Sequence, residues 1–296
     1  MVSILLTCYN HMRFLPDAYR SVLEQTYGDF ELLAIDDGSK DGTREWLSQH
    51  SDPRLRLVFN RENLGTYASL NVGIAAARGD FVAILNDDDL WAPDKLATQV
   101  SAFETNPRLG LVHTGGWFID ENGNRHSDSA PMGFPYPDLH DGDVLLDLVE
   151  RNQVITSSVL LRREVFDKCG LFDPAYYGCG DWHMWLRIAA SFQVAQIREP
   201  MTFYRVHDEN AAWNSQKMLE DDVRVREWLS AWSPFVERPD SKPALAHNWA
   251  CLGTEYTRLG DRSKGRQAYS NSIRQLPTRL KSYARWAMTF LPGGQG

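Results

Sequence analysis

Short apolar runs alternate with segments of helical periodicity along the first third of the chain, and this alternation restricts the fold more than any other feature. The apolar runs lie at 2–7, 30–35, 55–59 and 81–85, and the helical segments between them lie at 14–25, 42–49 and 66–77. Strands that alternate with helices of about ten residues pair in parallel through right-handed crossovers. We therefore expect an α/β fold in which helices flank a mostly parallel sheet.

Beyond the first third, the pattern of apolar residues changes twice. Between about 109 and 206, apolar runs at 109–113 and 156–161 are followed by a helix-like segment at 182–190. From about 213 onward the periodic segments are helical, at 244–259, 264–275 and 278–290. We therefore predict an α/β domain at 1–212 and a helical C-terminal extension at 213–296, which consists of a helical hairpin and a basic amphipathic helix.

The net charge and the cysteines argue against two broad classes of protein. The formal charge is -8 over 296 residues, whereas a general nucleic-acid binder needs a basic face for the phosphate backbone. We therefore expect no nucleic-acid partner. The four cysteines have neither disulfide-like pairing nor metal-ribbon spacing. No apolar stretch approaches the roughly 18 residues of a membrane-spanning helix, and the short apolar start lacks the basic flank of a signal peptide. We expect a cytoplasmic protein with reduced thiols.

The charge is distributed unevenly, because no acidic residue follows Asp261. Near the end of the chain, basic and aromatic residues share one segment: Arg279, Lys281, Tyr283, Arg285, Trp286 and Phe290. Such residues at near-helical spacing are typical of helices that lie on the surface of an anionic membrane. A helix that packs on the α/β domain and exposes a solvated basic face explains the same pattern, so a peripheral membrane contact and simple packing both stay open.

Polar side chains follow three of the predicted strands at the points where these strands end. They are residues 7–10, the turn Asp36-Asp37-Gly38-Ser39 and residues 86–89. Ligands of doubly wound sheets bind at the carboxyl ends of the strands. A carboxylate of the second cluster can accept hydrogen bonds from a nucleotide base or ribose, although Asp, Gly and Ser also suit a plain strand-to-helix turn.

Three consecutive carboxylates, Asp87, Asp88 and Asp89, follow the fourth apolar run. Like charges this close repel each other and cost stability, so a chain usually keeps them where a cation or a positive partner compensates. Mg²⁺ and Mn²⁺ bind one or two carboxylates together with phosphate oxygens of a substrate. The alternative is an acidic turn before a helix with Pro93 near its first position. The place of the triplet directly after a buried-looking strand favours the metal site.

Five segments resemble, in the same order, the family 2 glycosyltransferases of the GT-A fold. They read S-I-L-L-T-C-Y-N, A-I-D-D-G-S-K-D-G-T, R-E-N-L-G, A-R-G-D-F-V-A-I-L-N-D-D-D-L-W and G-D-W-H-M-W-L-R, and the likeness spans about residues 2–210. The resemblance implies a Rossmann-like catalytic domain and an inverting, metal-dependent enzyme that moves a sugar from a nucleotide diphosphate-sugar to a hydroxyl group. It implies UDP as the nucleotide and, as the acceptor, a glycan or lipid-linked glycan in cell-surface polysaccharide synthesis.

The resemblance also assigns roles to individual residues. It implies that Asp88 binds Mg²⁺ or Mn²⁺, with support from Asp89 and from the histidine of Tyr204-Arg205-Val206-His207. The metal motif of the family usually reads Asp-x-Asp-Asp, and Asn86 replaces its first aspartate in this chain. The implied donor-binding residues are Thr7, Tyr9, Asn10, Asp36, Asp37, Asn63, Asn86 and Asp87.

The segment Gly180-Asp181-Trp182 resembles the place where the family keeps its catalytic base, usually written Glu-Asp, and Gly180 stands at the position of the glutamate. The resemblance implies that Asp181 is the base, although Asp also suits the N-cap of the predicted 182–190 helix. The implied residues of the acceptor pocket are Asn152, Ser157, Ser158 and Trp182.

Two other functions use part of the same pattern. A sugar-phosphate nucleotidyltransferase uses a comparable nucleotide fold and metal, but it normally carries a Gly-rich, basic phosphate loop near the amino end, which residues 7–13 lack. A non-catalytic nucleotide-sugar-binding module is the alternative from another class. Release of nucleotide diphosphate on addition of an acceptor separates an enzyme from such a module.

Overall fold

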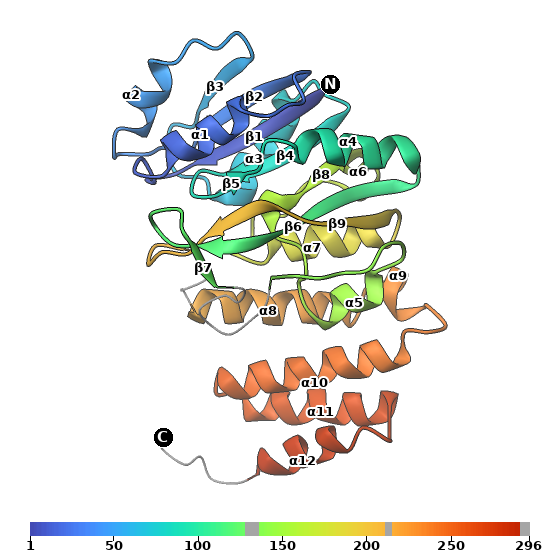
Figure 1. The fold of residues 1–296 in the computed structure, drawn as a ribbon. Coiled ribbons are helices and arrows are strands. Elements are labelled where there is room, and N and C mark those ends of the chain that lie inside the picture. Colours follow the sequence, from blue (N-terminus) through green and yellow to red (C-terminus); the bar gives the residue numbers. More distant parts are fainter. Residues whose placement is uncertain (128–135, 211–214, 291–296) are drawn as a thin grey trace. The chain divides into compact units, whose positions relative to one another are not determined.

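The computed structural model describes residues 1–127, 136–210 and 215–290 (Figure 1). The chain divides into two compact units. The first contains Met1–Val144, Gln153–Tyr176 and Gly180–Asn210, and the second contains Leu145–Asn152, Tyr177–Cys179 and Ala211–Gly296. None of the described helices combines the length and the apolar character that crossing a membrane requires.

Four strands of the first unit form a parallel sheet, as the alternation of apolar runs and helical segments predicts. β1 (Val2–Cys8), β2 (Phe30–Asp36), β3 (Leu55–Phe59) and β4 (Phe81–Asn86) lie in the order β3-β2-β1-β4, and the helices between them are α1 (Leu15–Leu23), α2 (Thr43–Ser48) and α3 (Thr66–Ala76). Val2 pairs with Phe30 on one side and with Phe81 on the other. The carboxyl ends of β1, β2 and β4 therefore lie side by side.

Beyond β4 the same sheet becomes mixed. It continues through β8 (Leu160–Arg162), β6 (Leu109–Ile119), β9 (Gln193–Arg205) and β5 (Leu90–Trp91), while β7 (Arg125–Ser127) pairs with β6 outside this path. β8 is antiparallel to β4, whereas β9 is parallel to β6. β5 begins directly after the acidic residues 87–89, and its Leu90 pairs with Phe203 of β9. This pairing brings the end of β9 close to the end of β4.

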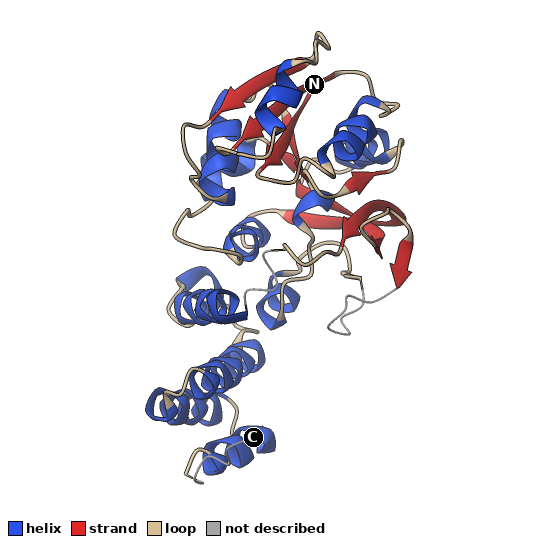
Figure 2. Ribbon diagram, turned by 90° about the vertical axis from the view of Figure 1, so that its left-hand side faces the viewer, coloured by secondary structure: helices blue, strands red, loops and turns tan. Residues whose placement is uncertain are grey.

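Helices cover both faces of the sheet in the first unit (Figure 2). On one face, leucines of the strands, of α1 and of α4 (Lys95–Thr105) share a buried cluster that includes Leu6, Leu15, Leu32, Leu85 and Leu96. On the other face, Gly73 of α3 lies so close to the sheet that an added Cβ would be 2.6 Å from Cδ1 of Ile35. Burying one leucine fully contributes roughly 1.5–3 kcal/mol, so this core fixes the positions of the strand ends. η1 (Thr156–Ser158), α6 (Glu164–Cys169) and α7 (Gly180–Ala189) complete the unit.

The second unit contains the helical extension that the sequence predicts. Its helices are α5 (Leu145–Glu150), α8 (Ser215–Leu229), α9 (Ser233–Val236), α10 (Lys242–Arg258), α11 (Arg262–Gln275) and α12 (Leu280–Met288). α10 and α11 form a hairpin, in which Asp261 caps α11 by accepting the N–H of Lys264. Gly253 lets the two helices approach, because an added Cβ would lie 2.8 Å from the ring of Tyr269.

Residues 177–179 belong to the second unit because one side chain of α8 holds them. The carboxylate of Asp221 accepts the N–H groups of Tyr177, Gly178 and Cys179 over 2.7, 2.7 and 3.1 Å. Three backbone donors on one carboxylate make a strong anchor, since hydrogen bonds to a charged group contribute about 1.5–3 kcal/mol each.

Candidate active site

Loops that follow β1, β2, β4 and β9 meet at one edge of the sheet in the first unit. The N–H of Asp87 donates to the carbonyl of Thr7 over 3.1 Å, and the N–H of Asp37 donates to the carbonyl of Cys8 over 2.9 Å. At the end of β9, the N–H of Arg205 donates to the carboxylate of Asp89 over 2.9 Å. The polar clusters that follow the predicted strands are therefore brought together.

Asp37 holds the loop that carries Asn63. Its buried carboxylate accepts the N–H groups of Leu64 and Gly65, each over 2.9 Å, and the side-chain amide of Asn60 over 2.8 Å. Asn63 itself is exposed. In this structure Asp37 therefore has a structural role, whereas Asn63 is accessible to a ligand.

Asp36 is fully buried and closes the turn after β2. It accepts the N–H of Ser39 and the Nε–H of Arg44, both over 3.0 Å. The turn requires Gly38, whose φ is 76° and whose Cβ, if present, would lie 2.8 Å from the backbone of Glu62. The sequence predicts that Asp36 and Asp37 bind the donor directly, but donors of the protein itself occupy both carboxylates here.

The three predicted donor-binding residues at the end of β1 and in the loop after it differ in their exposure. Thr7 is buried, and its hydroxyl donates to the side chain of Asn86 over 3.2 Å. Asn10 has a φ of 57° and accepts the N–H of Lys40 over 2.8 Å, which links the loops after β1 and β2. The side chain of Tyr9 is 43% exposed. Tyr9 is thus the member of this loop that can stack on a nucleotide base.

Asp89 fixes the acidic turn to the sheet. Its fully buried carboxylate accepts the hydroxyl of Ser157 and the N–H of Arg205. Burial, together with the charge of Asp88, raises the pKa of Asp89 well above its usual range, and the hydrogen bonds from Ser157 and Arg205 oppose this shift only in part. The sequence predicts Asp89 as a supporting metal ligand, but both of its oxygens are used to hold the turn.

Asp87 joins the acidic turn to the loop after β1. It accepts the N–H of Tyr9 over 2.9 Å, and its other oxygen lies 2.9 Å from Nδ1 of His11. Burial alone would lower the pKa of His11, but the hydrogen bond to Asp87 and the charges of Asp87 and Asp88 outweigh it and raise this pKa to about 9. The pair orients the His11 ring and tethers the first loop to the end of β4.

Asp88 lies beside two histidines. Its Oδ2 is 3.0 Å from Nε2 of His207 and 3.4 Å from the side-chain amide of Asn210. Among the described residues, His11, Asp88 and His207 form a group whose potential ligand atoms all lie within 4.8 Å of one another. Two imidazoles and a carboxylate are a donor set that divalent metal ions bind, so the residues present fit a metal at this position.

Arg205 supplies the positive charge that lets three carboxylates stay together. Its side chain is buried, and its Nε–H donates to the carbonyl of Asp88 over 2.8 Å, while Nη1 donates to the carbonyls of Asp120 and Glu121. Burial lowers the pKa of Arg205, although the nearby carboxylates oppose that shift. The guanidinium thus fixes both the shape and the charge balance of the acidic turn.

Asp181 lies in the first turn of α7, not at its N-cap. Its carboxylate accepts the hydroxyl of Thr156 over 2.8 Å and the N–H of Trp182 over 2.6 Å. The ring of Tyr67 explains the glycine before it, because a Cβ on Gly180 would lie 2.7 Å from that ring. A larger residue at position 180 would require Tyr67 to move.

Two consecutive residues of η1 tie Asp181 to the acidic turn. The hydroxyl of Thr156 donates to Asp181 over 2.8 Å, and the hydroxyl of Ser157 donates to Asp89. Asp181 therefore lies beside the acidic turn. Burial first, and then the charges of Asp89, Asp88 and Asp181, raise the pKa of the Tyr204 phenol well above its usual range.

Three of the four residues predicted for the acceptor pocket are buried, and Asn152 is exposed. Ser157 and Ser158 are fully buried, and Trp182 is 3% exposed. Ser157 accepts the N–H of Asn86 over 3.1 Å in addition to donating to Asp89, so it supports the acidic turn from below. Because both serines are fully buried, the structure does not support a contact between them and an acceptor. Asn152 belongs to the second unit.

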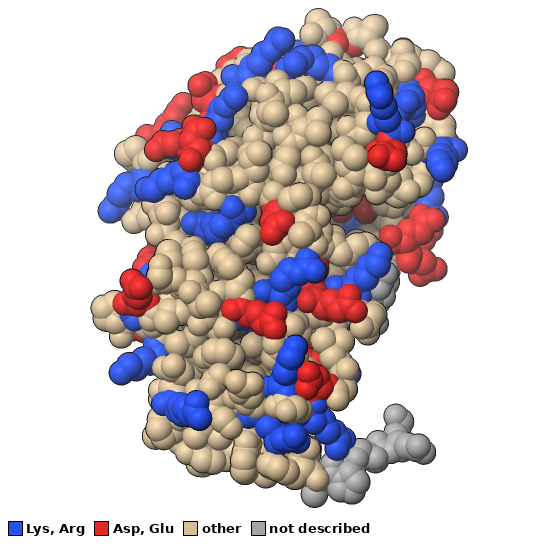
Figure 3. All heavy atoms as spheres, turned by 180° about the vertical axis from the view of Figure 1, so that it is seen from behind, with Lys and Arg blue, Asp and Glu red and all other residues tan. Residues whose placement is uncertain are grey.

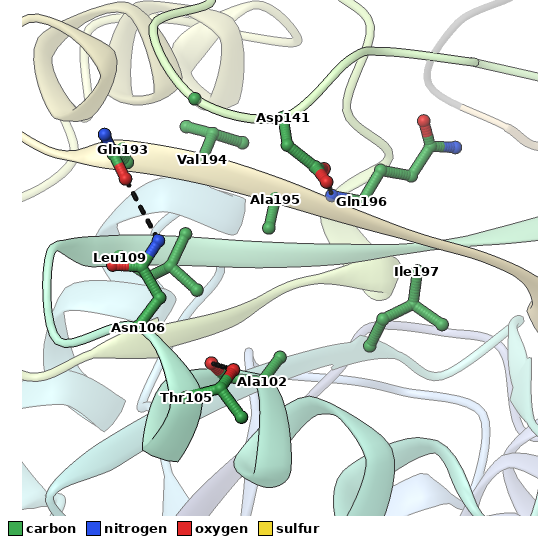
Figure 4. Close-up of a pocket in the computed structure, with 11 residues that line it drawn as sticks. Ala102, Thr105, Asn106, Leu109, Asp141, Gln193, Val194, Ala195, Gln196 and Ile197 are labelled. Carbon is green, nitrogen blue, oxygen red and sulfur yellow. Dashed lines mark hydrogen bonds between the residues drawn. The ribbon is translucent and has the colours of Figure 1, made fainter.

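A cavity of about 340 Å³ lies elsewhere in the first unit (Figure 4). It is next to Leu109 and Gln193, which begin β6 and β9, whereas the acidic turn lies at the opposite end of β9. Its polar lining residues bond to each other: the Asn106 amide donates to Gln193 over 3.0 Å, and Asp141 accepts the N–H of Gln196 over 2.8 Å. We assign no chemistry to this cavity.

Sequence reasoning missed His11 and Asn210. His11 directly follows the predicted Thr7–Asn10 cluster, so its place after the first strand was a usable signal. Asn210 gives no such signal, because its contact with Asp88 depends on how the loop after β9 returns to the acidic turn.

Residues 3–170 match the model of the family described as Glycosyl transferase family 2. The match covers more than half of the chain. The chain therefore belongs to glycosyl transferase family 2, which confirms the resemblance, and it is a glycosyltransferase.

Relatives named as glycosyltransferases support this assignment. An uncharacterized glycosyltransferase of Nostoc sp. (strain PCC 7120) is 31% identical over 71% of this chain and 66% of that protein. The chain thus spans just under two thirds of this relative. A relative from Escherichia coli, named UDP-Glc:alpha-D-GlcNAc-diphosphoundecaprenol beta-1,3-glucosyltransferase, is 27% identical over 86% of this chain and 93% of that protein.

Solved structures show the same fold. The structure of Staphylococcus aureus TarS in complex with UDP aligns with a TM-score of 0.71 at 14% identity, over 98% of this chain and 88% of that one. A mannosyltransferase from Pyrobaculum calidifontis in complex with GDP-Man and Mn²⁺ aligns with a TM-score of 0.59 at 20% identity, over 97% of this chain and 84% of that one. These similarities confirm the GT-A fold.

Proposed function

We propose that this glycosyltransferase is metal-dependent and inverting, and that it moves a sugar from a UDP-sugar to a hydroxyl of a glycan or lipid-linked glycan. The observation that carries the proposal is that Asp181 and the group His11, Asp88 and His207 lie at one edge of the sheet, where consecutive residues Thr156 and Ser157 bond to Asp181 and to Asp89. The names of the relatives give the chemistry: one uses UDP-Glc and a diphosphoundecaprenol-linked acceptor, and one structural neighbour binds UDP.

On the donor side, exposed residues contact the nucleotide and buried ones hold them in place. The ring of Tyr9 stacks on the base, and Asn63 reaches the ribose or base from the loop that Asp37 holds. Thr7 and Asn86 bond to each other beneath the diphosphate. Because these loops are tied by backbone hydrogen bonds to neighbouring strands, little reorganisation accompanies donor binding.

Departure of the nucleotide diphosphate builds negative charge at the leaving oxygen. Asp88 and His207 would hold a Mg²⁺ or Mn²⁺ ion, which supplies a Lewis acid for that charge when bound. Arg205 keeps the backbone of Asp88 in position. The acidic turn thus serves the leaving group, which separates it from the task of activating the acceptor.

Asp181 is the proposed base. The hydroxyl of Thr156 and the N–H of Trp182 donate to its carboxylate and orient it. As a carboxylate it takes the proton of the acceptor hydroxyl as this oxygen attacks the anomeric carbon from the side opposite the diphosphate. Attack from that side inverts the anomeric configuration.

The decisive experiment compares the wild type with Asp181→Asn. A thermal-shift screen of nucleotide-sugars with Mn²⁺ first identifies the donor, because ligand binding raises the melting temperature. We expect Asp181→Asn to keep donor binding and to lose transfer by about 10²- to 10⁴-fold. Near-normal turnover of the variant would remove Asp181 from the mechanism. Donor binding without release of nucleotide diphosphate in the wild type would favour a binding module, and formation of a nucleotide-sugar from a sugar phosphate would favour a nucleotidyltransferase.

We further propose a cytoplasmic enzyme whose α12 contacts an anionic membrane. Apolar side chains of α12 and its end are exposed, with exposed fractions of 77% for Leu280, 64% for Met288 and 59% for Phe290. Lys and Arg side chains gather over the lower part of the view in Figure 3, and no acidic residue follows Asp261 in the sequence. Apolar and basic groups together suit an anionic lipid surface, where a lipid-linked acceptor would reside.

Vesicle flotation tests this contact. The full chain should float with vesicles that contain phosphatidylglycerol and stay behind with neutral vesicles, since the attraction is partly electrostatic. A truncation after Gln275 should lose the binding. Equal flotation of the truncated chain would contradict the role of α12.

A further inference from the structure

His11 occupies the same centre as the two proposed metal ligands, although it comes from a different loop. It follows β1, Asp88 follows β4 and His207 follows β9. The potential ligand atoms of the three residues lie within 4.8 Å of one another. Ligands on opposite sides of one ion, each bound at ~2.1 Å, are ~4.2 Å apart, so small side-chain rotations bring all three atoms to one ion.

Two neighbours fix the His11 ring in a position that suits a ligand. Nδ1 of His11 lies 2.9 Å from Asp87, so the bond to this carboxylate leaves Nε2 as the nitrogen that can bind a metal. Metal-binding histidines commonly donate their second N–H to a carboxylate, which orients the ring and makes it a better ligand. The ring also packs edge-on against His207, with ring centroids 5.1 Å apart.

We propose that His11 is a third protein ligand of the divalent cation, and that this centre selects imidazole-binding transition-metal ions over Mg²⁺. The inference rests on the proposed metal site and deepens it. Mg²⁺ takes oxygen ligands almost exclusively and dehydrates reluctantly. Ions such as Co²⁺ and Zn²⁺ bind imidazole nitrogen well, and their affinity for a given nitrogen and oxygen site exceeds that of Mn²⁺. Asp88 is the single carboxylate of the set, because Asp89 is held by Ser157 and Arg205 and Asp87 by Tyr9 and His11.

The competing explanation is that His11 serves only as an ion-pair partner of Asp87. The two roles make different demands on the ring. An ion pair or hydrogen bond needs a donor at the Nδ1 position, whereas the metal needs the Nε2 position. His11→Asn places an amide near the former Nδ1 and removes Nε2, so it separates the two.

The experiment measures metal binding by the full chain without any sugar donor. Wild type and His11→Asn are stripped with a chelator, dialysed and titrated with Co²⁺ and with Mg²⁺ by calorimetry, while the visible spectrum of bound Co²⁺ reports nitrogen ligation. We expect the wild type to bind Co²⁺ at least about tenfold more tightly than Mg²⁺. His11→Asn should lose about 10- to 100-fold in Co²⁺ affinity, since even indirect partners of a ligand contribute that much, and its affinity for Mg²⁺ should change much less.

Two controls keep the result interpretable. His126 is exposed on β7, outside the site, so His126→Ala should leave Co²⁺ binding unchanged and thereby exclude adventitious surface histidines. Pulsed electron paramagnetic resonance of the Mn²⁺-loaded wild type counts the coordinated imidazoles without any variant, and we expect two. One coordinated imidazole, or wild-type Co²⁺ affinity in His11→Asn, would overturn the inference. Because the titrations use no sugar donor, a failure to detect sugar transfer would not change their result. If the wild type transfers sugar and His11→Asn binds Co²⁺ as tightly as the wild type, this inference is refuted while the proposed function stands.

Discussion

One acidic turn follows β2 and another follows β4 of the same sheet. The two turns look alike in the sequence but differ in the structure. After β2, Asp36 and Asp37 accept hydrogen bonds from backbone N–H groups of their own and the next loop. After β4, Asp88 faces His207 and Asn210, and no backbone N–H within the described part of the chain reaches its carboxylate. Carboxylates filled by backbone donors hold loops, whereas a carboxylate beside imidazoles is available to a cation.

Among the variants that separate the two turns, the largest effect should come from Asp88→Ala. We expect turnover with the donor and Mn²⁺ to fall by about 10²- to 10³-fold, because charge on the leaving group loses its compensation. The melting temperature without metal should stay the same or rise, since one of three adjacent like charges is removed. Initial rates and thermal melts with chelator measure the two quantities.

Asp80→Ala is the matched control for that variant, because the Asp80 side chain is 82% exposed at the other end of the sheet. It should change neither the rate nor the melting temperature appreciably. A destabilised Asp88→Ala that still turns over normally would erase the distinction between the two turns.

Asp37→Ala should show the opposite pattern, because its main effect should be a loss of stability. The variant leaves two backbone N–H groups and the amide of Asn60 without their charged acceptor. We expect the free energy of unfolding to fall by about 3 kcal/mol, as hydrogen bonds to charged groups contribute about 1.5–3 kcal/mol each and water partly replaces them. Urea denaturation at neutral pH measures this. An unfolding free energy equal to that of the wild type would show that Asp37 is not a structural carboxylate.

The smallest effect concerns Glu31, a buried carboxylate near the amino end of β2 and thus away from the carboxyl ends of the strands. Burial alone would raise its pKa, but hydrogen bonds from the Ser3 hydroxyl, Arg56 and the N–H of Arg78 outweigh it and lower the pKa below 4.5. A carboxyl whose pKa is lowered by folding stabilises the protein above its unfolded pKa, and the contribution is lost as the pH falls through the folded value. We expect Glu31→Gln to cost about 1 kcal/mol at pH 7.

The pH dependence sharpens this last test. The difference in unfolding free energy between wild type and Glu31→Gln should shrink as the pH falls below about 4.5, the ordinary pKa of a glutamate. Paired urea titrations at several pH values measure the difference directly. A difference that stays constant across this range would contradict the role assigned to Glu31 as a carboxylate filled by protein donors.

Much of the fold follows from local pattern in the sequence. The first four strands and their helices are visible as alternating apolar and helical segments. Strands buried on both faces of a parallel sheet appear as continuous apolar runs, and the helices that cover the sheet have the apolar periodicity of an amphipathic helix. Their order then places the clusters after β1, β2 and β4 at one edge. The helical extension is visible in the same way, because its apolar residues recur with the period of an α-helix.

The roles of single carboxylates depend on partners that are distant in sequence. Asp89 is committed to the turn by Ser157, 68 positions away, and by Arg205, 116 positions away. Nothing within the acidic triplet itself distinguishes Asp88 from Asp89, and only the family resemblance singles out Asp88 and gives Asp89 a supporting role. The place of His11 after the first strand is a signal in the sequence, but its position beside His207 depends on the loop that follows β9.

The pairing of Leu90 with Phe203 has a consequence for the order in which this chain acquires its properties. The parallel core uses strands within the first 86 residues, but Asp88 meets His207 across 119 positions. Contacts of such separation close late, because the loop entropy must be overcome first. Uptake of the proposed ion in a rapid-mixing experiment would therefore report that β9 has docked and would time the completion of the catalytic unit.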